Sequence, residues 1–143
     1  MEVLVAHRDA SARRSLAKAL RGDGCDVQEV ADGESALSHL LGEEPPRVAV
    51  VDWDLPVIEG PELCRLVHDF HLQRPPYIIL LAAAGHHAEV TSGLLAGAND
   101  CLRTPVADAE LRGRVEMGIH FVELPWGRGG ARLTQRPSLA TSG

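Results

Sequence analysis

One carboxylate of this chain stands where α/β proteins commonly place their chemistry. Asp52 ends the apolar run 48–51, and a turn-rich segment that contains Pro56 and Gly60 follows it directly. Consecutive β-branched and small apolar residues are typical of a strand that is buried on both faces of a parallel sheet. Side chains at the carboxyl end of such a strand face the crevice in which open α/β proteins bind their ligands. Asp52 is therefore a candidate functional carboxylate by position.

Several basic side chains could act together with Asp52. His7 and Arg8 directly follow the first apolar run of the chain and are expected at the same edge of the sheet. A His7–Asp52 pair could serve acid–base chemistry in a small enzyme, and Arg8 could pair with Asp52 as a built-in cation. A transition-metal site would also need His86 and His87. Adjacent histidines rarely ligate one ion well, so solvated loop histidines are the favoured interpretation.

Five strand patterns alternate with five helix patterns along the chain. The strands are predicted at 3–6, 25–30, 48–52, 77–82 and 99–102, and the helices at about 11–21, 33–41, 60–70, 87–96 and 108–121. This alternation predicts a single α/β domain of the doubly wound type, a parallel sheet with helices on both faces, reached by right-handed crossovers. Asp9 or Ser11 is the expected N-cap of the first helix, and Phe70 is an expected buried position of the third.

The composition limits the classes of function. The chain has 143 residues and a net charge of -6, which allows one domain with a sizeable core and a tail. The last 20 residues contain three arginines and no acidic residue, so the rest of the chain is more acidic than the chain as a whole. This acidic body is not expected to bind nucleic acid. No apolar run approaches the length of about 20 residues that spans a membrane, and no signal-peptide pattern is present. Three cysteines without metal-type spacing fit a reducing compartment, so a cytoplasmic location is expected.

The periodic pattern stops after Val122. Residues 1–122 are predicted to form the domain, and residues 123–143, which contain Gly, Pro and Arg, a flexible tail or linker. Trp126 could anchor this tail to the body or to a partner, or belong to a mobile linker. An output domain could follow residue 122 if the chain is the first part of a longer regulator.

Five motifs in a fixed order carry a family resemblance. They are Asp52 at its strand end, Leu55-Pro56-x-x-Glu59-Gly60, Asp32-Gly33-x-x-Ala36-Leu37, Gly93-Leu94-x-Ala96-Gly97-Ala98-Asn99-Asp100 and Thr104-Pro105. Over residues 2–122 the chain resembles the receiver domain of bacterial two-component response regulators. The resemblance implies a flavodoxin-like (βα)5 fold with a five-stranded sheet in the order 2-1-3-4-5, and a cis peptide bond before Pro105.

The resemblance also implies a phosphoacceptor site, from which this chain departs. In the family, carboxylates at the ends of the first and third strands hold magnesium, a kinase transfers a phosphoryl group to the third-strand aspartate, and a hydroxyl and a lysine contact that group. Asp52 matches the acceptor. The positions that correspond to the acidic pair, the hydroxyl, the lysine and a coupling aromatic residue are occupied by His7 and Arg8, Ala82, Thr104 and Cys101.

These replacements suggest a degenerate receiver. Magnesium needs hard oxygen ligands, so its binding is expected to be lost, and with it any cofactor. The leading hypothesis is a non-enzymatic, phosphorylation-independent protein–protein interaction module; the alternatives are a phosphoacceptor that a histidine kinase still modifies on Asp52, and the small enzyme. The resemblance places the contact surface for a protein partner or a second copy on the fourth helix, fifth strand and fifth helix, with Arg103, Asp108, Glu110, Arg112 and Arg114. Cys64 and Cys101 are expected in the core, and Asp54 is expected to be exposed.

Overall fold

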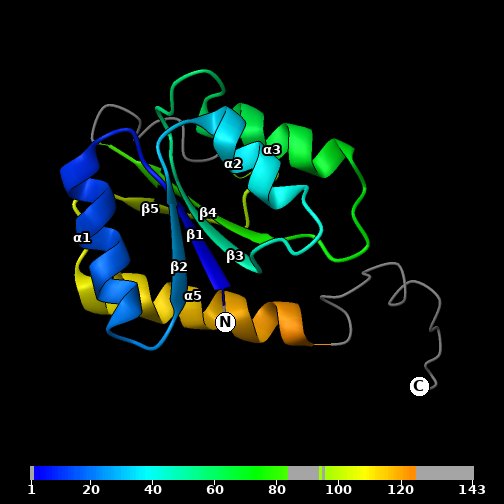
Figure 1. Ribbon diagram of the computed structural model, residues 1–143. Coiled ribbons are helices and arrows are strands. Elements are labelled where there is room, and N and C mark those ends of the chain that lie inside the picture. The colour runs from blue at the N-terminus through cyan, green and yellow to red at the C-terminus, as the bar shows by residue number, and fades with distance from the viewer. Residues whose placement is uncertain (1, 84–93, 95, 125–143) are drawn as a thin grey trace.

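The computed structural model describes residues 2–83, 94 and 96–124 (Figure 1). Its strands are β1 (Glu2–Ala6), β2 (Asp26–Val30), β3 (Val48–Asp52), β4 (Tyr77–Ala82) and β5 (Asp100–Arg103). Its helices are α1 (Ala10–Arg21), α2 (Gly33–Leu40), α3 (Gly60–Asp69) and α5 (Asp108–Glu123). The predicted helix at 87–96, His86, His87 and Trp126 lie outside the described residues, apart from the end of that helix at 94 and 96.

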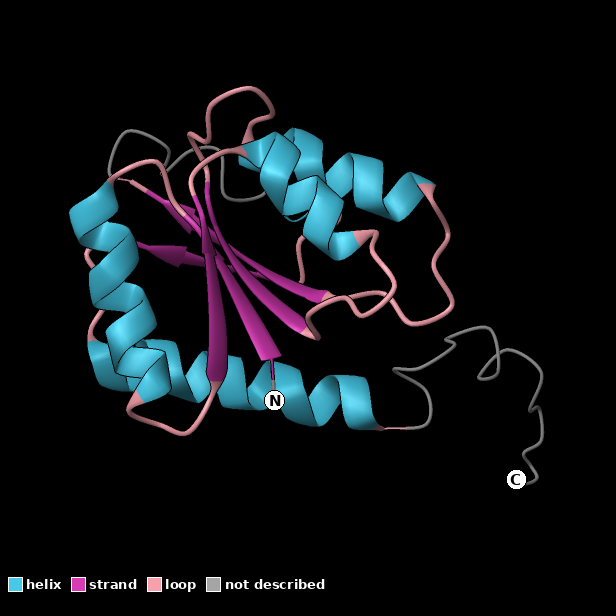
Figure 2. Ribbon diagram, viewed as in Figure 1, coloured by secondary structure: helices cyan, strands magenta, loops and turns pink. Residues whose placement is uncertain are grey.

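The five strands form one parallel sheet in the order β2-β1-β3-β4-β5. Helices α1 and α5 cover one face of this sheet, and α2 and α3 cover the other (Figure 2). The doubly wound parallel fold and its strand order are thereby confirmed. Because all strands run in one direction, the ends of β1 and β3 meet at one edge, where Asp52 lies.

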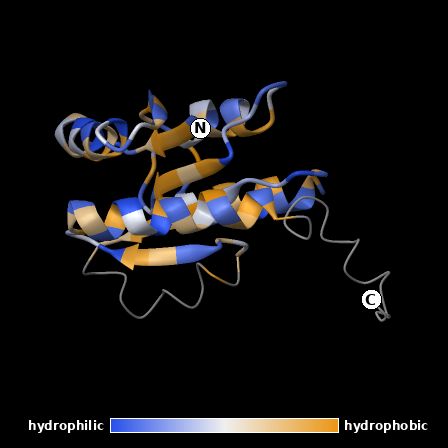
Figure 3. Ribbon diagram, turned by 90° about the horizontal axis from the view of Figure 1, so that it is seen from below, coloured by the Kyte–Doolittle hydropathy of each residue, from blue (hydrophilic) through white to orange (hydrophobic). Residues whose placement is uncertain are grey.

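Alternate residues of each central strand supply the two cores. Val48 and Val50 of β3 pack with α1 and α5, whereas Ala49 and Val51 pack with α2 and α3. All five residues of β3 are buried. Figure 3 shows hydrophobic strands between helices in which hydrophobic and hydrophilic residues alternate. Burial on both faces explains why this strand appears in the sequence as a continuous apolar run.

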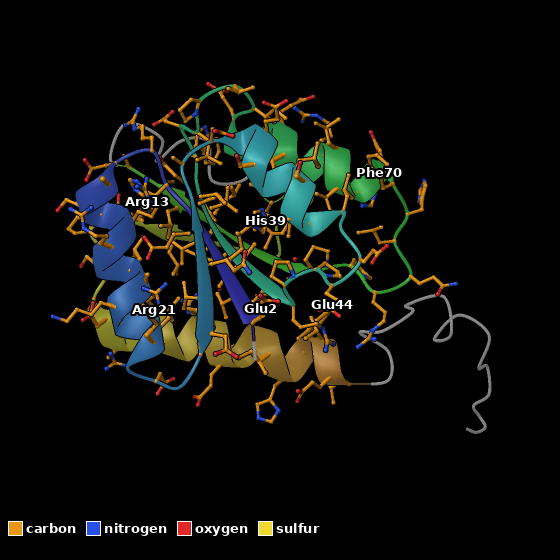
Figure 4. All side chains as sticks on the ribbon, in the orientation of Figure 1. Glu2, Arg13, Arg21, His39, Glu44 and Phe70 are labelled. Carbon is orange, nitrogen blue, oxygen red and sulfur yellow. The ribbon has the colours of Figure 1, made fainter. Side chains whose placement is uncertain are left out.

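A side-chain cap marks the start of α1, and a turn of the chain marks the end of α3. Asp9 Oδ2 accepts a hydrogen bond of 2.8 Å from the backbone N–H of Ala12, which confirms Asp9 as the N-cap of α1. Phe70 was expected to be buried, and this prediction is wrong: its side chain is 58% exposed at the outer end of α3 (Figure 4). Phe70 is the C-cap of that helix and His71 has a φ of 51°. The chain turns there, so the buried helical stripe does not extend to Phe70.

Three arginine contacts join helices α1 and α5 to strands of the sheet or their flanking residues. Arg47, just before β3, donates from Nη2 to the carbonyl oxygen of Val122 in the last turn of α5 over 2.9 Å. On the opposite side of the domain, Arg13 and Arg21 of α1 reach Glu29 of β2, with N···O distances of 3.7 and 3.0 Å (Figure 4). Among the described residues, no helix is long and apolar enough to cross a membrane.

Candidate functional site

Asp52 closes β3 at the edge where the loops after β1 and β3 meet. Asp52 is 7% exposed and is the one buried charged residue in the described part of the chain. A Cβ on Gly60 would lie 2.8 Å from the carbonyl oxygen of Asp52, so only glycine lets the start of α3 pack this closely on the strand end. The loop between them is therefore compact, and the carboxylate is held inside it.

The two oxygens of Asp52 have different surroundings. Oδ1 accepts a hydrogen bond of 3.2 Å from the backbone N–H of Asp54. Oδ2 is buried and has no hydrogen-bond partner among the described residues. A buried acceptor without a partner costs about 1–3 kcal/mol. The site thus contains one satisfied and one unsatisfied carboxylate oxygen.

Arg8 lies over this unsatisfied oxygen. Its Nε is 3.7 Å from Asp52 Oδ2, and its Nη2 is 3.8 Å from Asp54 Oδ2. The guanidinium thus spans two carboxylates at ion-pair distance, too far for hydrogen bonds. Its side chain is 56% exposed, so solvent screens both contacts. The expectation that Asp54 is exposed is wrong: its side chain is 28% exposed, because the loop after β3 turns it towards Arg8.

His7 approaches the same oxygen from the end of β1. Its side chain is 15% exposed, and its Nδ1 lies 3.7 Å from Asp52 Oδ2. The same Nδ1 accepts a hydrogen bond of 3.0 Å from the backbone N–H of Asp9. A neutral imidazole whose Nδ1 accepts carries its proton on Nε2. Two acceptor atoms, Nδ1 and Oδ2, therefore face each other.

The other replaced positions, Ala82, Thr104 and Cys101, lie at or near the ends of β4 and β5. Within the described residues, none of them forms a hydrogen bond or an ion pair with the carboxylate of Asp52. Ala82 is fully buried at the end of β4. The backbone N–H of Thr104 donates to the carbonyl oxygen of Ala82 over 3.0 Å, and the Thr104–Pro105 peptide bond is cis, as expected. Cys101 is half-buried and packs against the core between the sheet and helices α2 and α3.

A groove of about 470 Å³ opens beside His7. Its walls come from α1, from the segment 104–106 and from Asp108, and Asp52 is not one of the lining residues. The small-enzyme hypothesis requires a ligand cavity around both His7 and Asp52. Of these two residues, only His7 lines the groove, so the groove gives the small-enzyme hypothesis no support.

The metal-site hypothesis depends on residues that are only partly described. Within residues 2–83, 94 and 96–124, no group of three or more His, Cys, Asp or Glu side chains could hold a metal ion. The side chains within 4 Å of Asp52 Oδ2 are the imidazole of His7 and the guanidinium of Arg8. The guanidinium of Arg8 carries a positive charge and would repel a metal cation.

A strained turn at Val57, next to the site, was not predicted from the sequence. Val57 has a φ of 73°, an unfavourable value for a β-branched residue, and its side chain is 76% exposed. The backbone N–H of Ile58 donates to the carbonyl oxygen of Pro56 over 2.8 Å, which closes a γ-turn around Val57. Gly33 at the start of α2 donates to the same oxygen over 2.9 Å and has no room for a Cβ beside Ile58. The motif around Pro56 predicts a turn, but valine gives no signal for a positive φ.

The predicted partner surface is described only in part, because most of its fourth helix lies outside the described residues. Arg103, Asp108 and Glu110 are exposed, whereas Arg112 and Arg114 are half-buried. Arg114 Nη1 lies 2.6 Å from Asp100 Oδ2, and this hydrogen bond to the carboxylate raises the pKa of Arg114.

An apolar patch continues this surface along α5. Met117 is 60% exposed and Phe121 is 41% exposed, and both follow Glu110 and Arg114 at helical spacing. The ring of Phe121 lies 5.5 Å from that of Tyr77 on β4, measured between centroids. The α5 surface is therefore charged at its start and apolar towards its end.

The described cysteines are not activated thiols. Cys64 is buried in α3, and burial raises its pKa to about 12. Burial also raises the pKa of the half-buried Cys101. A thiol needs its thiolate form to react. The core role predicted for Cys64 is confirmed, and Cys101 occupies the border of the core.

Comparisons with known proteins agree with this geometry. A family model described as "Response regulator receiver domain" matches residues 3–116. The transcriptional regulatory protein CutR of Streptomyces coelicolor is 35% identical over 115 residues, which are 80% of this chain and 52% of CutR. The phosphate regulon transcriptional regulatory protein PhoB of Rhizobium meliloti is 36% identical over 101 residues, which are 68% of this chain and 42% of PhoB.

Solved structures show the same relationship. The receiver domain of the Francisella response regulator 1452 matches with a TM-score of 0.75 at 27% identity, covering 83% of this chain and 96% of that one. The chain spans about half the length of the two transcriptional regulators.

Proposed function

This chain belongs to the response regulator receiver domain family, and from that membership we propose that it is a phosphorylation-independent member, acting as a protein–protein interaction module in signal transduction. The observation that carries the proposal is the position of Arg8, whose Nε lies 3.7 Å from Asp52 Oδ2. A fixed cation thus stands beside the acceptor carboxylate, at a position where the family has a carboxylate.

The charge of Arg8 works against magnesium. Mg²⁺ prefers octahedral oxygen ligands, of which one or two are carboxylates. A unit-charge contact at 4 Å is worth about 4 kcal/mol near a protein surface, and the exposure of Arg8 lowers this value. Exchanging a carboxylate for a guanidinium changes the sign of that contact. We therefore propose that this site does not recruit Mg²⁺.

The remaining departures support the same interpretation. Phosphoryl transfer relies on positioning and on neutralisation of charge by metal ions and cationic side chains. Ala82 supplies no hydroxyl at the end of β4, and Thr104 supplies no ammonium group after β5. A phosphoryl group on Asp52 would have neither partner there. The domain would therefore signal through its surface and not through a phosphoryl-dependent switch, and it would have no enzymatic activity.

The partner would be a protein. The charged and apolar parts of the α5 surface, with Arg103 of β5, form the contact region for a second copy or for another signalling protein. The relatives CutR and PhoB are named as transcriptional regulators, and the segments that match this chain are 52% of CutR and 42% of PhoB. An output domain beyond residue 122 is consistent with those shares. The acidic receiver itself is not proposed to contact DNA.

One observation favours the alternative function, a working phosphoacceptor. Asp52 Oδ2 has no hydrogen-bond partner among the described residues, and Arg8 is close enough to neutralise charge on a group attached there. In that case Arg8 would replace the metal as the charge partner. This alternative shares the fold and the residues of the leading proposal, so the two differ only in the chemistry of Asp52.

Intact mass spectrometry tests the two functions directly. The protein is incubated with acetyl phosphate and Mg²⁺, beside Asp52→Asn as a control for the site and beside a variant with His7→Asp, Arg8→Asp, Ala82→Thr and Thr104→Lys, which reinstates the family residues. The proposal expects no phosphoryl group on the wild type and one on the variant. A phosphoryl adduct on the wild type that Asp52→Asn abolishes would establish the alternative.

A further inference from the structure

We propose that Trp126, from the C-terminal segment of this chain, binds in a pocket at the opposite end of the strands from Asp52. The pocket is lined by Tyr77, the first residue of β4, whereas Asp52 is the last residue of β3. The inference goes beyond the proposed function and does not depend on the chemistry of Asp52. It assigns the domain a second binding site, with an indole as its occupant.

Three parts of the fold meet around this pocket, which has a volume of about 170 Å³. The segment before β4 contributes Pro75 and Pro76, and the strand contributes Tyr77. The last turn of α5 contributes Phe121 and Val122, and residues of α3 line the pocket from the other face of the sheet. A cavity of about 150 Å³ can bind benzene. The pocket therefore has room for an aromatic ring.

The walls of the pocket are held together by contacts among themselves. A Cβ on Gly118 would lie 2.6 Å from Cδ1 of Tyr77, so the tyrosine ring packs directly on α5. Its centroid also lies 5.5 Å from that of Phe121. The backbone N–H of Tyr77 donates to the carbonyl oxygen of Arg47 over 2.9 Å, and Arg47 Nη2 donates to the carbonyl oxygen of Val122 over 2.9 Å. Because the pocket is preformed, an occupant does not have to order its walls.

The chemistry of the lining suits an indole. Aromatic side chains pack on proline rings, as they do where aromatic grooves recognise proline-rich segments. Phe121 is 41% exposed, so part of its ring is accessible to another aromatic group. A buried indole also needs an acceptor for its N–H. Asn99 lines the pocket, and its Oδ1 accepts from the backbone N–H of Ile78 over 2.8 Å; an amide oxygen has a second lone pair for a further donor.

The sequence brings Trp126 to the rim of the pocket. It follows the lining residue Val122 by four positions and Leu124 by two. Leu124 ends α5 with an extended backbone, the conformation that a following proline favours. An extended chain covers at most about 3.6 Å per residue, so the Cα atoms of Leu124 and Trp126 are within about 7 Å of each other. The end of α5 lies on the same side of the domain as the loop from α3 to β4 (Figure 1).

The tether favours this occupant over a separate molecule. Trp126 is the one aromatic residue in the sequence after Phe121, and the next large apolar residue, Leu133, comes nine positions after Leu124. A short tether gives its group an effective concentration in the range of about millimolar. A second copy or another protein would have to compete with that concentration.

Binding of Trp126 would change the surface of α5. Phe121 belongs both to the pocket and to the apolar end of the α5 surface, where its ring is partly exposed. An indole in the pocket would cover part of that ring. A protein that contacts the same end of α5 would then have to displace the C-terminal segment.

Nuclear magnetic resonance on the full chain tests the proposal. Nuclear Overhauser effects (NOEs) report whether the indole of Trp126 lies against Tyr77 and Pro76, and a mixture of isotope-labelled and unlabelled protein separates contacts within one molecule from contacts between two. Hydrogen exchange of the indole N–H reports its protection. Phe121→Ala removes part of the pocket, and Met117→Ala is the matched control, because Met117 is 60% exposed on the same helix and does not line the pocket.

The expected result is a set of NOEs from Trp126 to Tyr77 and Pro76 within one molecule. The indole N–H should exchange about tenfold faster in Phe121→Ala than in the wild type, because local opening exposes it, and at the wild-type rate in Met117→Ala. Trp126→Ala should shift the ring resonances of Tyr77, whereas Leu133→Ala should leave them unchanged. Absence of the NOEs within one molecule overturns the proposal, and NOEs found only between two molecules overturn it in favour of a second copy as the occupant.

Discussion

The guanidinium of Arg8 lies beside the buried carboxylate of Asp52, with Nε 3.7 Å from Oδ2. Arg8 simultaneously lies 3.8 Å from Asp54, so one cation serves two carboxylates. Under the proposed function, the charge at position 8 is the main determinant of whether the site binds a metal ion, and the first prediction tests it.

Reversing that charge is expected to create a magnesium site. The double variant His7→Asp, Arg8→Asp should bind Mg²⁺ at least about tenfold more tightly than the wild type, which corresponds to about 1.4 kcal/mol. Trp53 directly follows Asp52 and is 5% exposed, so its fluorescence reports the titration in a Trp126→Phe background. The single variant Arg8→Gln is the control for loss of the cation alone. Equal affinities in the wild type and the double variant would contradict this account.

Relieving the turn at Val57 is expected to stabilise the fold. Val57→Gly and Val57→Asn place residues that tolerate a φ of 73° at this position. Each should raise the free energy of unfolding by about 1 kcal/mol, since strain of this kind costs about 1–3 kcal/mol and glycine loses part of the gain through chain entropy. Urea denaturation measures the change. Glu59→Gly, at a residue with an ordinary φ of -67°, is the control and should destabilise.

Two glycines of α5 should respond in opposite ways to alanine. A Cβ on Gly118 would lie 2.6 Å from Cδ1 of Tyr77, and nothing lies within 4 Å of the corresponding position on Gly113. Gly118→Ala should destabilise by about 1–3 kcal/mol through overpacking. Gly113→Ala should stabilise by up to about 1 kcal/mol through helix propensity. Thermal unfolding measures the change in stability of each variant. Destabilisation of the same size in both would show that the contact between Gly118 and Tyr77 is unimportant.

The buried thiol of Cys64 predicts a specific loss of stability in alkali. Burial raises its pKa in the folded protein to about 12 from the ordinary value of 9.0, so the folded state retains the proton that the unfolded state gives up between these values. Stability from this group is complete below about pH 9 and falls by about 1.4 kcal/mol per pH unit above it. Cys64→Ala lacks this dependence. The difference in unfolding free energy between the two proteins should therefore shrink between about pH 9 and pH 10, and a constant difference would refute the prediction.

The parts of the site that follow from strand periodicity could be predicted from the sequence. Asp52 had to end a buried strand, and parallel strands had to bring His7 and Arg8 to the same edge. The details that depend on one rotamer or one dihedral angle could not be predicted. Whether His7 Nδ1 faces Asp9 or solvent is decided by the loop geometry, and periodicity carries no information about it.

The wrong expectations have the same physical origin. Phe70 continues the apolar spacing of α3, but the helix ends just before it and the chain turns. Asp54 is polar and lies in a loop, which suggests exposure, yet the cation above it draws the side chain inward. The end of a helix decided the exposure of Phe70, and a contact with a residue distant in sequence accompanies the partial burial of Asp54.

The hydrogen bond from Arg47 to the carbonyl oxygen of Val122 joins two segments that lie 75 residues apart in the chain. Arg47 lies just before the central strand β3, and Val122 lies in the last turn of α5, so this hydrogen bond ties the end of the helix to the start of the strand. A partner that packs against the end of α5 would therefore contact a helix turn that is hydrogen-bonded to the segment just before β3.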